Sequence, residues 1–139
     1  LISEHLEHIK LYGNLMLQNS KVLERELCKY KIPVIERNPD LPTTQQIWIQ
    51  CTSSNEAYTL FKKLEDYNIL VNYRQLAYHL GYGLRLGTAA ITLCGMQPNQ
   101  CEQLAYYIQA IYHNCIPAGF RREVENFINN IWEGAQPYG

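Results

Sequence analysis

Gly83-Leu84-Arg85-Leu86-Gly87-Thr88 is the stretch that decides how this 139-residue chain is built. Apolar and polar residues alternate in it, as expected of a strand with one face in a core, so Leu84 and Leu86 point inward and Arg85 points to the opposite face. The flanking glycines permit close approach of another group. A guanidinium on a rigid strand suits bidentate binding of a carboxylate, whereas strand arginines commonly face water or pair with an acid. The stretch alone leaves both interpretations open.

Three other short strands are predicted, from alternating or β-branched residues bounded by turn signals. They cover Pro33–Glu36, Gln45–Cys51 and Ile69–Tyr73, and the strand quoted above covers Gly83–Thr88. Residues 74–82 are predicted to form an aromatic-rich loop.

Four helices are predicted around these strands. The first, over residues 4–30, carries apolar and small residues spaced alternately three and four apart, which gives one continuous stripe. A capping box of Ser53 and Glu56 opens the second helix, Pro98 starts the third and Pro117 is expected to start the fourth. The order of elements predicts an α+β fold: a small, mostly antiparallel sheet covered by helices, with a long N-terminal helix whose length suggests a connector between domains.

Composition limits the kind of partner. The chain has 47% hydrophobic residues and a formal net charge of −1, so we expect one folded domain without the basic surface that nucleic acid or an anionic membrane requires. No apolar run approaches the length of a membrane span. Neither a signal peptide nor a transit peptide is visible.

The cysteines and histidines give no pattern of a metal site. Five cysteines, an odd number with no CxxC pair, make a disulfide framework or a structural zinc site improbable. We predict five buried thiols in a reducing cytosol, hence a cytoplasmic protein. His5 and His8 lie three apart near a helix start, but they lack a third ligand and are interpreted as solvated. The cysteines are Cys28, Cys51, Cys94, Cys101 and Cys115.

The run Gly83–Met96, GLRLGTAAITLCGM, resembles the segment near the C-terminus of serine hydroxymethyltransferases, where Gly-[Ile/Leu]-Arg-[Ile/Leu]-Gly-Thr and a following Thr-x-x-Gly recur. Three other stretches resemble the same family in order. Lys10–Leu27 is similar to its interdomain helix, Thr44–Ile49 to the first long strand of its small domain, and Asn68–Asn72 to the next strand. The resemblance covers residues 10–115.

This resemblance implies a fold-type I, pyridoxal-phosphate-dependent transferase that acts on the Cα–Cβ bond of glycine-, serine- or threonine-type amino acids. In the family, the arginine that matches Arg85 binds the α-carboxylate of the substrate, so Arg85 is the one predicted site residue, and no catalytic, cofactor or metal residue is predicted. Residues 1–139 would be the C-terminal small domain of a larger enzyme, without its large cofactor-binding domain. A start at Leu1 within a helical pattern agrees with a fragment. The expected partners are the amino acid and a second copy in a homodimer of the full-length enzyme.

Pyridoxal phosphate is expected only in the full-length enzyme. No stretch resembles the family's threonine-rich lysine motif, and Lys62 and Lys63 are interpreted as solvated charges. We therefore expect this fragment to bind no cofactor and to be inactive alone.

Some positions depart from the family pattern and keep alternatives open. Gln45 and Gln46 stand where Asp and His are usual, and Tyr73 and Arg74 stand where Lys-Asn is common. The threonine transaldolases keep the same scaffold with altered surroundings and need no folate. The alternatives are the small domain of an aminotransferase or glycine acyltransferase, and a binding module that has lost the catalytic half.

Overall fold

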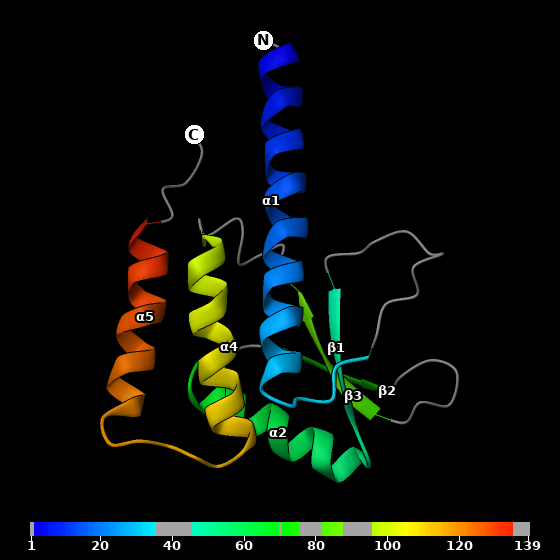
Figure 1. Cartoon of the computed structure of the whole chain (residues 1–139), viewed down its shortest axis with the longest axis vertical. Helices are drawn as coiled ribbons and strands as arrows, with labels where there is room; N and C mark the ends of the chain where they lie inside the picture. The colour runs from blue at the N-terminus through cyan, green and yellow to red at the C-terminus, as the bar shows by residue number, and fades with distance from the viewer. Residues whose placement is uncertain (1, 36–45, 70, 76–81, 88–95, 135–139) are drawn as a thin grey trace.

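The computed structural model describes residues 2–35, 46–69, 71–75, 82–87 and 96–134. In chain order the elements are α1 (Ile2–Lys29), β1 (Gln46–Cys51), α2 (Ser54–Asp66), β2 (Asn72–Gln75), β3 (Tyr82–Gly87), α4 (Pro98–Tyr112) and α5 (Phe120–Gly134). Figure 1 shows α4 between α1 and α5. The sheet lies on the other side of α1, and α2 crosses below α1 and α4.

The strands form an antiparallel sheet in the order β1-β3-β2, so β3 is central. The predicted α+β class with an antiparallel sheet is confirmed. The predicted strand Pro33–Glu36 is wrong within its described part, because only Val34 bridges to β1, opposite Ile49. The bridge consists of Gln50 N–H to the Pro33 carbonyl (2.8 Å) and Ile35 N–H to the Trp48 carbonyl (2.9 Å), and Pro33 has no N–H to extend it.

The C-terminal cap of α2 shifts the predicted strand Ile69–Tyr73. The strand was expected from Ile69, but the Ile69 N–H donates to the Leu64 carbonyl at 2.9 Å, and Asn68 adopts a φ of +62°. This αL turn belongs to the helix end, so β2 begins only at Asn72.

The predicted loop over residues 74–82 is correspondingly too long. Arg74 and Gln75 belong to β2, and Tyr82 begins β3, while residues 76–81 lie outside the described part.

The last helix also begins later than its proline suggests. It starts at Phe120 rather than Pro117, because Gly119 has a φ of +77° and the Phe120 N–H closes a turn onto the Pro117 carbonyl at 3.2 Å.

The predicted N-cap of α2 is correct: the Ser53 hydroxyl accepts a hydrogen bond from the Glu56 N–H at 3.1 Å. The Glu56 carboxylate, however, bonds the backbone N–H and hydroxyl of Thr52 rather than closing the box on Ser53.

One face of the sheet forms the core. Its inward side chains pack with buried residues of α1, α2 and α4, as the alternation in β1 and β3 predicts. These core residues include Leu23, Leu27, Ile47, Ile49, Ala57, Leu60, Leu64, Leu84, Leu86, Ile108 and Ile111.

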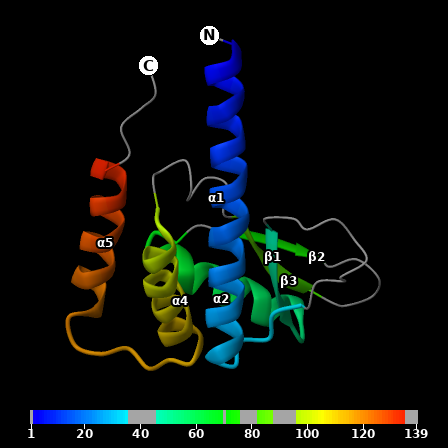
Figure 2. The same cartoon turned by 45° about the horizontal axis from the view of Figure 1, so that its top comes forward.

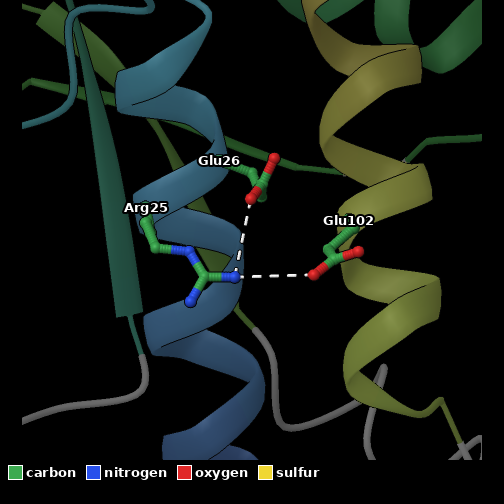
Figure 3. Close-up of polar contacts among 3 residues, drawn as sticks. All are labelled: Arg25, Glu26 and Glu102. Carbon is green, nitrogen blue, oxygen red and sulfur yellow. Dashed lines mark hydrogen bonds and ion pairs between the residues drawn. The ribbon is translucent and has the colours of Figure 1, made fainter.

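Helices α1 and α4 lie side by side in both views (Figure 2), and both carry small buried residues, including Ser20, Cys101 and Ala105. On the solvent side, Arg25 Nη2 lies 3.5 Å from a carboxylate oxygen of Glu26 and 3.5 Å from one of Glu102 (Figure 3). The Arg25 side chain is 63% exposed, so these pairs contribute little to stability. The side chains of residues 2–13 of α1 lie outside the described part, and its role as a connector between domains stays a prediction.

Helix α5 is held to α4 by aromatic contacts. The ring of Tyr107 meets Phe120 and Phe127 edge to face, with centroids 5.6 Å and 5.1 Å apart. Its hydroxyl donates to the Glu123 carboxylate at 3.2 Å. Burial is the main cause that raises the Tyr107 pKa.

Candidate carboxylate-binding site

Arg85 lies in the middle of the central strand, on the face of the sheet opposite the core. Its neighbours Leu84 and Leu86 are 0% and 5% exposed, whereas the Arg85 side chain is half-buried. The antiparallel register places Trp48 of β1 beside Arg85 on one side and Asn72 of β2 on the other. The predicted orientation of Arg85 is therefore confirmed.

The Arg85 guanidinium lies over the indole of Trp48. The central guanidinium carbon is 5.9 Å from the ring centroid, within the range of a cation–π interaction. The indole accepts no conventional hydrogen bond from the guanidinium, so this contact leaves its N–H groups able to bind a carboxylate with two parallel hydrogen bonds.

Glycines flank Arg85 along its strand. Gly83 and Gly87 occupy the positions two residues before and after Arg85, which share its face of the strand. Neither adds a side chain beside the guanidinium, and glycine permits close approach of another group.

Arg85 has no acidic partner within the described part of the chain. None of the three strands contains an Asp or Glu, and no ion pair joins Arg85 to a described carboxylate. Among the described residues Arg85 therefore has no counter-ion, and an anionic ligand would supply one. The role of Arg85 as a carboxylate-binding residue stays a prediction.

The described lysines do not fit a covalent attachment point for pyridoxal phosphate. Lys21, Lys29, Lys31 and Lys62 are exposed, and Lys62 pairs with Glu65 at 3.5 Å, as a solvated surface charge does. Half-buried Lys63 instead donates to the Asn114 side chain at 2.9 Å. A lysine that bonds to this cofactor is activated by desolvation, and none of the described lysine side chains is buried.

The prediction of five buried cysteines is wrong for two of them. Cys28 and Cys115 are exposed, because one lies on the outer side of α1 and the other in the turn after α4, whereas Cys51 and Cys101 are buried. Cys94 lies outside the described part.

Within the described ranges, no three His, Cys, Asp or Glu residues come together in a way that could hold a metal ion. No helix among them is both long and apolar enough to cross a membrane.

No family model matches the chain. The serine hydroxymethyltransferase of Pyrobaculum arsenaticum is 26% identical to it over 120 residues, which cover 84% of this chain and 28% of that enzyme. The serine hydroxymethyltransferase of Saccharolobus solfataricus is 31% identical over 100 residues, which cover 68% of this chain and 23% of that enzyme.

The chain is similar in sequence to part of the serine hydroxymethyltransferases. The predicted resemblance to this family is thereby confirmed. The chain spans only 28% of the length of the first serine hydroxymethyltransferase and 23% of the second. The crystal structure of L-threonine transaldolase from Pseudomonas fluorescens superimposes with a TM-score of 0.77 at 24% identity, over 86% of this chain and 28% of that chain, which shows a common fold.

The residue that sequence reasoning missed is Trp48. Its place on the same face as Arg85 follows from the alternation of Gln46–Cys51, which puts Ile47 and Ile49 in the core. Its pairing with Arg85 depends on which strands are adjacent and in which register, and neither can be read from local alternation.

Proposed function

We propose that this chain is the C-terminal small domain of a pyridoxal-phosphate-dependent transferase that acts on the Cα–Cβ bond of glycine-, serine- or threonine-type amino acids. Similarity to serine hydroxymethyltransferases and a fold shared with a threonine transaldolase support this assignment. Both hydroxymethyl transfer and transaldolase chemistry are compatible with it. The cofactor would be held mainly by a large domain outside this sequence.

In this proposal Arg85 binds the α-carboxylate of the amino acid. The observation that carries the assignment is a half-buried guanidinium between two glycines, on strands that contain no Asp or Glu. A bidentate, charge-assisted pair would fix both the position and the plane of the carboxylate. Fixing the carboxylate orients the bonds at Cα, so the contribution of this domain is to bind and align the substrate rather than to move a proton.

The test uses the full-length enzyme with its cofactor bound. Arg85→Ala should raise the KM for the amino acid about 100-fold, because a charge-assisted contact contributes a few kcal/mol, and Arg85→Lys should recover only part of the loss. The spectrum and affinity of the bound cofactor should stay unchanged. Arg25→Ala, which removes an exposed arginine from the surface of α1, is the matched control and should leave the KM unchanged.

The products separate the reaction classes. Formaldehyde transfer from serine that depends on tetrahydrofolate identifies a hydroxymethyltransferase, and folate-independent exchange of aldehydes on threonine identifies a transaldolase. Formation of a keto acid from the amino donor would instead identify an aminotransferase. A normal KM in Arg85→Ala would overturn the carboxylate-binding role.

A further inference from the structure

The contact between Trp48 and Arg85 has a consequence for how the carboxylate site is prepared. We propose that Trp48 is a positioning residue: its indole holds the Arg85 guanidinium through their cation–π contact and keeps the N–H groups ready for the substrate. The inference rests on the proposed function of Arg85 and adds to it a second residue, which does not itself have to touch the carboxylate.

Register makes this contact a fixed feature of the sheet. Trp48 and Arg85 are direct partners across the antiparallel strands β1 and β3, so their side chains leave the sheet on the same face. Ile47 pairs with Leu86, and Ile49 with Leu84, and all four are buried. A slip of β1 by one residue would move these side chains out of the core, so the core itself holds the indole beside the guanidinium.

Arg85 needs such support because its own strand offers none. Gly83 and Gly87 provide no side-chain walls, and the described strands provide no acidic partner. An arginine without contacts samples many rotamers, and binding of a ligand must then order it. Within the described residues, Trp48 is the aromatic ring over which the Arg85 guanidinium lies. A guanidinium held by a ring is preorganised, and because the indole carries no charge, it leaves the full positive charge for the ligand.

Another arginine of the described part, Arg121, makes a cation–π contact and serves as an internal reference. The guanidinium carbon of Arg121 lies 4.6 Å from the ring centroid of Tyr67, and Arg121 also donates to the Asp66 carbonyl at 2.8 Å. This pair joins α5 to the end of α2, away from the strands that carry Trp48 and Arg85. A substitution of Trp48 should therefore leave Arg121 unchanged.

The first experiment measures the order parameter of the arginine Nε–Hε groups by ¹⁵N relaxation in the 139-residue chain. We expect Arg85 to be ordered in the wild type, nearly as ordered in Trp48→Phe, and mobile in Trp48→Leu, which keeps apolar bulk but removes the ring. Arg121 should be ordered in all three, and its signal reports that each variant is folded. Trp48→Met replaces Trp48→Leu if the leucine variant does not fold. Equal order of Arg85 in the leucine or methionine variant and the wild type would overturn the positioning role.

The second experiment measures kinetics in the full-length enzyme. Trp48→Leu should raise the KM for the amino acid about fivefold, and Trp48→Phe about twofold, with kcat unchanged, as expected for a lost cation–π contact that acts on binding alone. If Arg85→Ala weakens binding but Trp48→Leu does not, the positioning role is wrong while the proposed function stands. If Trp48→Leu frees Arg85 in the relaxation experiment but Arg85→Ala has a normal KM, the contact is real and the proposed function is wrong.

Discussion

The side-chain amide of Asn19 donates a hydrogen bond of 3.0 Å to the backbone carbonyl of Met96, across 77 positions of the sequence. Asn19 lies on α1 and is fully buried, and Met96 ends the run Gly83–Met96 just before α4 begins. The bond therefore fastens the long helix to the end of the segment that also contains Arg85. A buried polar contact of this kind fixes how two elements meet, because the amide has no water to replace its partner.

Asn19→Ala should lower the free energy of unfolding by about 1–3 kcal/mol, because it leaves the Met96 carbonyl without its amide donor in a dry environment. Chemical denaturation monitored by circular dichroism gives the value. Asn14→Ala is the matched control, since Asn14 is exposed on the same helix and its loss should change stability by less than about 0.5 kcal/mol. Equal effects of the two substitutions would show that the buried hydrogen bond contributes nothing specific.

Lys31→Gly should make the protein more stable. Lys31 follows α1 with a φ of +62°, the left-handed region that costs a residue with a Cβ about 1–2 kcal/mol. Glycine avoids this cost, although its unfolded chain has more conformational entropy to lose on folding. We expect a net gain of about 0.5–1 kcal/mol. Lys29→Gly is the opposite control, because Lys29 is the last residue within α1 and glycine there should cost about 1 kcal/mol. A loss of stability in Lys31→Gly would contradict the cap geometry.

The buried thiol of Cys101 should lower the free energy of unfolding at alkaline pH. Burial, with a smaller effect of the Glu102 charge, raises the Cys101 pKa from 9.0 to about 12. Above pH 9 the thiol ionises in the unfolded chain but stays protonated in the fold, so the unfolded state binds fewer protons and gains stability as the pH rises toward 12.

Between pH 8 and 10.5 this thiol alone should remove about 1–2 kcal/mol from the free energy of unfolding. Denaturation curves of the wild type and Cys101→Ala at both values test this, and the variant should lose less than the wild type by that amount. Cys115→Ala, at an exposed thiol, should behave like the wild type. Identical pH dependence of Cys101→Ala and the wild type would exclude the buried thiol as the cause.

The 139-residue chain should not retain pyridoxal phosphate by itself. Among the described lysines none is buried, and Lys62 and Lys63 already contact Glu65 and Asn114, so a covalent adduct would stay exposed and reversible. The chain is mixed with the cofactor, dialysed, and measured by visible absorbance. A band that survives dialysis and disappears on substitution of a single lysine would refute this prediction.

The sequence by itself determined the local features of this protein. Alternation in Gln46–Cys51 and Tyr82–Gly87 fixed which side chains enter the core, since the pleat of a strand sends successive residues to opposite faces whatever the strand pairs with. Ser53 and Pro98 marked helix starts for equally local reasons, because each acts on backbone N–H groups within one turn. The outward orientation of Arg85 belongs to this class, whereas its interpretation as a carboxylate-binding residue rests on the resemblance to serine hydroxymethyltransferases and stays a prediction.

The tertiary structure alone decided which residues stand beside Arg85. Backbone hydrogen bonds are chemically the same in every register, so no local pattern states that β3 lies between β1 and β2 or that Trp48 and Asn72 are the partners of Arg85. That order follows from burying Ile47, Ile49, Leu84 and Leu86 together under the helices, a requirement of the whole core. The start of β2 at Asn72 was decided in the same way, because the chain had first to close the end of α2 onto Leu64 before it could pair as a strand.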